Sequence, residues 1–560
     1  MNSLLPGQLY ALLETNPAVT KLTREKSPLP CASFMEEALV IAASFRKKPR
    51  PILVVKHSLY SAQRLYERLS PLLGEKECAL FGADESLRVE AIAQSPEMTA
   101  RKVECLGSLI EEPCQVVVTC PSGLLRFLPE KEQFKDACIT IKTGDTVEME
   151  ELRRRLLAGG YYQTSHIDQP LSFAMRGGII DVYSINYDQP LRIEFFDNEV
   201  DSIRFFDAES QKTIVPVQEA RIIPASDVLF SKEDAELIRK KAGEILKERE
   251  DPMMESAVET ALDLIANSLS EPGLYPYYAL LDHCASIADY MNHPLMIISD
   301  ETAVRESIRR LNEETIAYLQ EMVQEKKLLP RFAVFHDFER IECRKRIVED
   351  PLSDNISNII DLHLPDGSLS ERLRMLSTQG KVVFALNEKE TALALNACAE
   401  EHHPYVLLKE DEEIKPGFSF TLFTMPEGFV LSDHGITVVS GKELFGVHHV
   451  SARYEKKFHS AEVIHSYDEL EPGDYIVHAN YGVGQYVGIE TREVQNVMRD
   501  FLRIIYRGNA ELLVPLEQFR LVRKFVSREG VVPKLNKLGT GNGRRRRNGF
   551  RRISTISPSG

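Results

Sequence analysis

Short apolar runs of strand length alternate with longer segments of helical periodicity over the first 130 residues. Buried strands are expected where apolar residues stand together in a short run, and helices where they recur every three or four positions. Strands that alternate with helices in this way indicate a parallel α/β unit. The pattern predicts strands at 51–56, 78–81 and 115–119, and helices at 59–73, 98–110 and 122–127.

The pattern changes after residue 134, where short strands follow one another with turns between them. One helical segment, 148–158, lies among them. This pattern of short strands with one helix predicts a small α+β module inserted into the α/β unit. Its expected strands are 138–141, 177–183, 191–196 and 203–207.

Three further regions follow the inserted module. Residues 231–325 are largely helical, with one apolar strand at 294–299. A second α/β pattern then runs to residue 445, and 450–468 are polar and unpatterned, as in a linker. The last region, 474–526, is compact β, with turns marked by glycine. Its expected strands are 475–478, 484–490, 501–506 and 511–515, and those of the second α/β region are 381–386 and 435–439, with a helix at 388–400.

Composition narrows the class of protein. The chain has 560 residues, of which 43% are apolar and 27% charged, so we expect a globular protein of several domains. No apolar run has the length of about 18 residues that a membrane span needs, and the N-terminus lacks the basic start of a signal peptide. The nine cysteines include no CxxC pair, which argues against a zinc ribbon and favours reduced thiols.

The charge is unevenly distributed. The net charge is −16 overall, with +2 over residues 471–539 and +6 over 540–560, so the first 470 residues carry −24. Binding to a nucleic-acid backbone needs clustered Lys and Arg. We therefore expect the acidic body to bind proteins rather than DNA.

The sequence lacks the motif of a nucleotide-binding loop. Such a loop, GxxxxGK[ST], lets backbone N–H groups and a lysine hold phosphates. Residues 28–36, where a fold of this kind would carry it, read PLPCASFME. Asp300 and Glu301 follow an apolar strand and have two readings, a magnesium-binding pair or a strand-end turn; the turn is favoured because no phosphate loop accompanies them. We expect no catalytic, cofactor-binding or metal-binding residues in this chain.

Two stretches carry a family resemblance. The first holds FAMRGGIIDVYS at 173–184 and LRIEFFDNEVDSIRFFD at 191–207, and it resembles a domain shared by UvrB and the transcription-repair coupling factors (Mfd). The second holds GDYIVHANYGVGQYVGIETREV at 473–494, DFLRIIYRGNAELLVPLEQ at 500–518 and PKLNKLG at 533–539. It resembles the RNA polymerase-interacting module of the coupling factors, which is related to CarD-type transcription factors. Both stretches in this order resemble the coupling factors specifically.

The resemblance implies a multidomain α/β protein. It would have a UvrB-like core with a degenerate P-loop fold, an inserted α+β module, a further α/β domain and a small SH3/Tudor-like β barrel. The implied map is 1–130 and 210–340 for the core, 131–209 for the inserted UvrA-binding module, 341–450 for the α/β domain of unclear role, 451–468 for the linker, 469–535 for the polymerase-interacting domain and 540–560 for a basic tail.

The resemblance also implies a function in transcription-coupled nucleotide excision repair, in the bacterial cytoplasm. The chain would be the adaptor portion, which binds UvrA and the β subunit of RNA polymerase and binds DNA only weakly. The family's ATP- and magnesium-dependent DNA translocase domains are absent from this sequence, so no enzymatic activity is expected. The alternatives are a UvrB-like ATPase that processes damaged DNA and a CarD-like transcription regulator. Residues from about 542 have two readings, a frameshift product or a basic tail that binds nucleic acid.

The resemblance assigns contact residues to both partners. For UvrA they are Arg176, Phe173, Arg192 and Arg204, because an arginine fork can pair with partner carboxylates. Arg192 and Arg204 could instead pair internally with Glu194, Asp197 or Asp201, and Tyr162 stands where some relatives carry an arginine. For polymerase the contact strand would hold Ile489, Arg492 and Val494. Relatives commonly have an apolar residue in place of Arg492.

Overall fold

A computed structural model gives the fold of this chain. The chain divides near residue 451 into two compact units, which are described separately. The structure describes residues 7–74, 76–83, 87, 96–167, 169–248, 251–267, 269–330, 333–350, 356–409, 412–421, 423–446, 470, 472–478, 482–494, 497–508, 510–515 and 522–524.

The first unit is built on a parallel five-stranded sheet. Its order is β13 (Lys345–Glu349), β12 (Leu295–Ser299), β1 (Ile52–Val55), β3 (Val116–Thr119) and β2 (Cys78–Phe81). Strands β1 and β3 are buried at every position, as their continuous apolar runs predict for a sheet covered on both faces. The expected parallel α/β unit is confirmed. Its helices are α3 (Phe34–Lys47), α4 (Leu59–Leu73), α6 (Pro96–Glu111) and α7 (Pro121–Leu124), and α1 (Gly7–Thr15) and α2 (Pro17–Thr23) precede them.

Strand β13 corrects one expected boundary. It pairs in parallel with β12, from Leu295 opposite Lys345 to Ser299 opposite Glu349. The first sheet therefore continues beyond residue 340, where the sequence placed the end of the core. The strand escaped prediction because charged residues take three of its five positions, as is common at the edge of a sheet.

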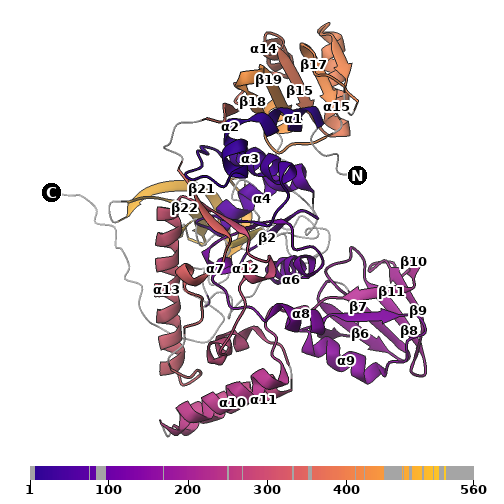
Figure 1. Ribbon diagram of the computed structural model, residues 1–560, viewed down its shortest axis with the longest axis vertical. Coiled ribbons are helices and arrows are strands. Elements are labelled where there is room, and N and C mark those ends of the chain that lie inside the picture. Colours follow the sequence, from indigo (N-terminus) through magenta and orange to yellow (C-terminus); the bar gives the residue numbers. More distant parts are fainter. Residues whose placement is uncertain are drawn as a thin grey trace, which may run out of the picture. The chain divides into compact units, whose positions relative to one another are not determined.

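The inserted module contains a six-stranded sheet and a separate strand pair. The sheet has the order β10 (Thr213–Val217), β9 (Glu199–Phe206), β8 (Leu191–Phe196), β7 (Ile179–Tyr183), β6 (Ser172–Arg176) and β5 (Tyr162–Thr164). Strand β4 (Ile139–Lys142) pairs with β11 (Glu219–Ile222), and helix α9 (Met149–Ala158) belongs to the same module (Figure 1).

Strands β10 and β11 extend this module beyond the expected end at residue 209. Pro216 made β10 hard to predict, because a proline lacks the N–H that a central strand needs. The structure places β10 at the edge of its sheet, where that loss is tolerated.

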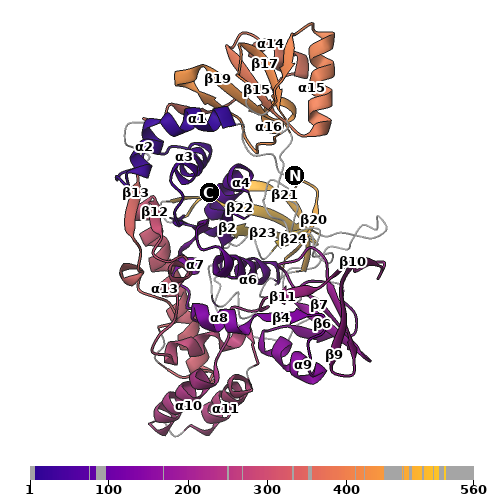
Figure 2. The ribbon, with the colours of Figure 1, turned by 45° about the vertical axis from the view of Figure 1, so that its right-hand side comes forward.

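A helical region connects the inserted module back to the first sheet. Helices α10 (Lys232–Lys247) and α11 (Pro252–Ala266) pack against each other (Figure 2). A buried ion cluster fixes the connection: the Asp227 carboxylate lies 3.0 Å from the Lys102 ammonium and 2.5 Å from Arg126 Nε. The remaining helical elements are α8 (Lys131–Ala137), η1 (Pro272–Leu280), α12 (Ile287–Tyr290), α13 (Glu301–Gln324) and η2 (Phe338–Arg340).

A second α/β domain completes the first unit. Its mixed sheet has the order β14 (Ile359–Asp361), β18 (Phe429–Leu431), β19 (Ile436–Ser440), β15 (Lys381–Ala385), β17 (Gly417–Thr421) and β16 (Tyr405–Leu407). Its helical elements are α14 (Leu369–Leu376), α15 (Glu388–Glu400), η3 (Ser432–His434) and α16 (Gly441–Phe445). This second α/β domain, residues 356–446, follows the core and the inserted module, and we call it the third domain.

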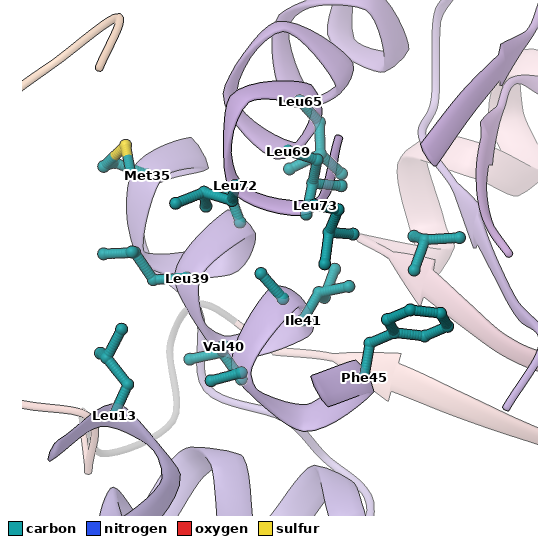
Figure 3. Packing of buried hydrophobic residues seen from close by; sticks show 14 of the residues in the cluster. Leu13, Met35, Leu39, Val40, Ile41, Phe45, Leu65, Leu69, Leu72 and Leu73 are labelled. Carbon is teal, nitrogen blue, oxygen red and sulfur yellow. The ribbon is translucent and has the colours of Figure 1, made fainter. Parts of the chain in front are cut away.

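Helix α3 lies at the centre of the largest apolar cluster of the first unit. The helix starts at the N-cap Ser33, whose Oγ accepts a hydrogen bond from the Glu36 N–H, and it ends with Arg46 and Lys47 in its last turn. Residues 35–45 are all buried. Figure 3 shows Leu39, Val40, Ile41 and Phe45 of α3 with Leu65, Leu69, Leu72 and Leu73 of α4.

The second unit is an antiparallel sheet with the order β23 (Ala510–Pro515), β22 (Val497–Tyr506), β21 (Gly482–Val494), β20 (Tyr475–His478) and β24 (Val522–Lys524). Ile476, Tyr486, Leu502 and Ile504 are buried in its core. The predicted β character is confirmed, and β21 and β22 are longer than the sequence pattern indicated. Within the strands that the structure describes, β23 and β24 are the two edges of the sheet. No helix in the described parts of the chain is long and apolar enough to cross a membrane.

Candidate protein-binding site

The six-stranded sheet of the inserted module carries a row of charged side chains on one face. Arg176 lies opposite Ile179, and Ile179 lies opposite Glu194 on β8. Two residues further along, Asp181 lies opposite Arg192, and Arg192 opposite Arg204. Directly paired residues project to the same face, as do residues two apart along a strand. All three predicted arginines therefore share one face.

Arg192 is held by its own module. Its Nε and Nη2 donate to the two carboxylate oxygens of Asp181 at 2.7 and 2.8 Å, and Nη2 also donates to Gln211 at 2.9 Å. Its guanidinium lies 4.3 Å from the centre of the Phe206 ring. The hydrogen bonds to Asp181 raise the pKa of Arg192. A bidentate pair with a buried carboxylate orients the Arg192 guanidinium and leaves few of its N–H donors for a partner.

Arg204 pairs with Glu194 across the β8–β9 ladder. Both guanidinium Nη groups donate to the Glu194 carboxylate, one at 2.7 Å, and Ser202 also donates to it. These hydrogen bonds lower the pKa of Glu194, and those from Arg204 have the largest effect. Of the two alternatives for Arg192 and Arg204, the structure therefore has the internal pairing. For Arg204 the partner is the expected Glu194, and for Arg192 it is Asp181, which was not among the candidates.

Arg176 differs from the other two arginines. Its side chain is 56% exposed, and Nη2 lies 3.7 Å from an Asp181 oxygen that Arg192 already holds. The turn after it is Gly177-Gly178, with Gly177 in the left-handed region at φ +56°. A Cβ on Gly178 would lie 3.0 Å from the Phe195 carbonyl oxygen, so the turn keeps β8 close. Arg176 is thus a poorly neutralised cation at the end of the sheet.

Phe173 corrects one sequence expectation. Its side chain has no exposed surface, and it lies opposite the buried Val182 on β7. Three positions separate it from Arg176, so it points to the opposite face of the sheet. Phe173 is a core residue and does not present a contact surface to a partner.

Phe196 is a residue of this surface that sequence reasoning missed. It is 78% exposed at the end of β8, directly before the turn at Asp197, whose φ is +59°. Alternation along β8 places it on the face of Glu194 and not on that of the buried Ile193. The exposure of Phe196 could have been predicted from the Ile-Glu-Phe-Phe run, because strict alternation along the strand directs its second phenylalanine to the same face as the glutamate.

The second unit offers one long strand, β21. Strand β20 and the two residues before it pair with β21 only as far as Tyr486. Ile489 is 42% exposed. The backbones of Arg492 and Val494 pair with Arg499 and Val497 of β22, and their side chains lie outside the described residues.

The carboxyl ends of the parallel strands, where open α/β sheets bind ligands, hold internal ion pairs. Lys56 follows β1 and donates to Glu37 on α3 at 2.6 Å, and Ser299 at the end of β12 donates to the other Glu37 oxygen at 3.0 Å. Glu349 ends β13 and is 5% exposed. Burial and the nearby Glu37 raise the pKa of Glu349 to about 8. The site is therefore filled by the chain's own side chains, and its cation Lys56 is already paired with Glu37.

Asp300 and Glu301 had two interpretations from the sequence, a magnesium-binding pair or a strand-end turn. Asp300 is the N-cap of α13 and accepts a hydrogen bond from the Ala303 N–H at 3.0 Å, while Glu301 pairs with Arg305 at 2.6 Å. Both carboxylates therefore have structural roles, as the turn reading expects. Among the residues that the structure describes, no cluster of three His, Cys, Asp or Glu side chains could hold a metal ion.

Comparison with known proteins identifies both modules. Residues 139–228 match the family model of the UvrB interaction domain, and residues 470–526 match that of the CarD-like/TRCF RID domain. Over most of its length the chain is similar to transcription-repair-coupling factors. The transcription-repair-coupling factor of Bacillus subtilis is 28% identical over 519 residues, which are 88% of this chain and 44% of that protein. That of Staphylococcus haemolyticus is 27% identical over 531 residues, 90% of this chain and 45% of that protein.

The chain thus spans less than half the length of the coupling factors that it matches. Arg176 and Phe196 lie inside the matched UvrB interaction domain, and Ile489 and Arg492 inside the matched RID domain. The first match ends at residue 228, which agrees with the assignment of β10 and β11 to the inserted module.

Proposed function

We propose that this chain is the adaptor portion of a transcription-repair coupling factor, linking RNA polymerase to UvrA in transcription-coupled nucleotide excision repair. One observation carries the proposal: a UvrB interaction domain and a CarD-like/TRCF RID domain occur in order on one chain. A protein with only one of them could bind one partner. Their combination favours the adaptor over a stand-alone CarD-like regulator.

The UvrA-binding surface would be the end of the six-stranded sheet around Arg176 and Phe196. Interface hot spots are enriched in arginine and in aromatic residues that fill a pocket of the partner. Arg176 supplies a guanidinium fork for a carboxylate, and the highly exposed Phe196 supplies an apolar anchor. Arg192 and Arg204 act as positioning residues, since their ion pairs fix the strands that carry the two contact residues.

The polymerase-binding surface would be strand β21, by addition to a strand of the polymerase β subunit. Strand addition uses backbone hydrogen bonds for affinity and alternate side chains for specificity. Ile489 and Arg492 lie on the part of β21 that extends beyond its pairing with β20. An unpaired charge buried in an interface costs affinity, so Arg492 requires an acidic residue on the partner.

The proposed fold assignments follow the same comparison. The parallel sheet with α3 would be a degenerate P-loop core, and the antiparallel sheet of the second unit an SH3/Tudor-like barrel. A UvrB-like ATPase is the less favoured function, because Glu37, Lys56 and Glu349 pack together at the carboxyl ends of the strands. The chain is then a binding protein, whereas ATP and magnesium belong to other domains of the family.

Co-binding tests the adaptor proposal. The purified chain is immobilised, saturated with RNA polymerase, and then titrated with UvrA, with each partner also titrated alone. We expect both partners to bind at once, with similar affinities alone and together. Binding of neither partner, or mutual exclusion of the two, would contradict the adaptor function.

A further inference from the structure

The third domain reaches into the carboxyl-end region of the first sheet. At the start of α3, the Ser33 hydroxyl donates to Asp361 Oδ1 at 2.7 Å. The Ser357 hydroxyl donates to the buried Glu36 carboxylate, and the Asn16 amide donates to the Ser357 carbonyl at 2.5 Å. A helix N-terminus at the carboxyl ends of such strands is a common place for a bound phosphate, because its free N–H groups point at the ligand. Here the chain's own carboxylates surround it.

A second contact joins the third domain to α4. Arg68 is almost fully buried, and its Nε and Nη2 donate to the two oxygens of Glu427 at 2.8 and 2.5 Å. Arg64 lies 3.5 Å from the same carboxylate. The guanidinium of Arg68 also lies 5.5 Å from the centre of the Phe34 ring, at the first position of α3. Arg64 and Arg68 of α4 thus face a carboxylate of the third domain.

An apolar contact lies beneath these ion pairs. The cluster around α1, α3 and α4 continues without a break into the third domain, and all its members are buried. Ion pairs beside such a contact fix its orientation, while the apolar area supplies most of the free energy. The members from the third domain include Ile359, Phe429, Leu431, Ile436 and Val438.

We propose that the third domain is a tethered internal ligand of the core, docked where an α/β sheet of this kind binds an anionic ligand. Asp361 and Glu427 present carboxylates to Ser33 and Arg68, as the phosphates of a nucleotide would to a serine and an arginine. The third domain and the first sheet therefore form one body. This role does not depend on whether the chain binds UvrA or polymerase.

Hydrogen exchange of the full chain tests the docking. The double variant Asp361→Ala/Glu427→Ala removes both carboxylates. We expect amide exchange in residues 34–47 and 356–361 to rise by more than about tenfold, because these segments then open without global unfolding. The strands β1 and β15, inside the two sheets, should keep their protection.

Two further variants make the test specific. Since the double variant takes the Glu427 carboxylate away from the buried Arg68, Asp361→Ala alone is the milder change, and it should raise exchange in the same two segments by a smaller factor. Glu401→Gln removes a carboxylate that pairs with Arg374 inside the third domain, and it should change neither segment. Unchanged exchange in both segments of the double variant, or equal loss of protection in β1 and β15, would overturn the proposal. So would protection of residues 34–47 of the wild-type chain by Mg-ATP.

Discussion

The three arginines on one sheet face differ in what remains for a partner to bind. Arg192 and Arg204 each hold a carboxylate with two donors, whereas Arg176, among the residues that the structure describes, has a long contact with a carboxylate that is already occupied. The sequence pattern places Arg192 and Arg204 on strands and Arg176 directly before one, but it does not show how many donors each has left. That number follows from the strand register, which is a tertiary property.

Substitutions on this face should affect binding without affecting folding. Arg176→Ala and Phe196→Ala should each weaken UvrA binding by about 1–3 kcal/mol, roughly 5- to 150-fold, because a charge-assisted contact or an aromatic anchor is lost. The melting temperature should change little, since both side chains are exposed. Calorimetric titration with UvrA measures the first effect, and thermal denaturation the second.

Arg154→Ala is the matched control for these variants. Arg154 is an exposed arginine of the same module, on α9, and pairs with Glu151. It should leave UvrA binding unchanged. Equal losses for Arg154 and Arg176 would mean that net charge, and not this surface, determines the affinity.

Glu349 should make stability depend on pH. Its pKa is raised to about 8 in the folded chain by burial and by Glu37, whereas the unfolded chain has the ordinary value near 4.5. The folded state therefore holds an extra proton between these values, and this contribution to stability is lost as pH rises toward 8. Urea denaturation between pH 5.5 and about 8.5 should show a steeper fall for wild type than for Glu349→Gln. Parallel curves would show that Glu349 does not titrate in this range. Lys56 and Cys31 are further titratable groups that face the Glu349 carboxyl.

Among the elements, those with a single clear period were predicted well. Strand β2 and helix α4 have the predicted limits, because a mostly buried apolar strand and an amphipathic helix each leave a strong pattern. The edge strands β13 and β10 were missed, since charges and a proline are tolerated only where one side of the strand lacks a neighbour. For the candidate site, the sequence pointed to the module that matches the UvrB interaction domain, while the exposure of Phe196 and the burial of Phe173 required the sheet.

The junction between the inserted module and the core depends on one carboxylate. Asp227 is fully buried between Arg126, after α7, and Lys102 on α6. Although burial opposes ionisation, these two cations keep the pKa of Asp227 well below its usual range. Asp227→Ala would remove the carboxylate that faces two buried cations, and it should lower the free energy of unfolding by about 3–5 kcal/mol.

Chemical denaturation of the full chain measures this loss. Glu259→Ala is the control, because Glu259 forms an exposed pair with Arg239 and its removal should cost about 0–1 kcal/mol. A small effect of Asp227→Ala would show that water or a rearranged side chain solvates Arg126 and Lys102.

For the whole molecule, the site normally open to a nucleotide is occupied from within. Mg-ATP should therefore leave the melting temperature unchanged even at millimolar concentration, because only a ligand that binds the native state raises it. Differential scanning fluorimetry with and without Mg-ATP is sufficient. A rise that depends on the triphosphate would restore the UvrB-like ATPase as a function for this chain.

The exposure of Phe196 also has a spectroscopic consequence. The chain contains no tryptophan, so its ultraviolet emission comes mainly from tyrosine. A Phe196→Trp substitution would place a single indole on the proposed UvrA surface, in contact with water in the free chain. Enclosure of that indole by a partner should shift its emission to shorter wavelength, whereas binding elsewhere should leave the emission maximum in place. The same side chain that is proposed to anchor the partner would then report its arrival, in real time and without a label.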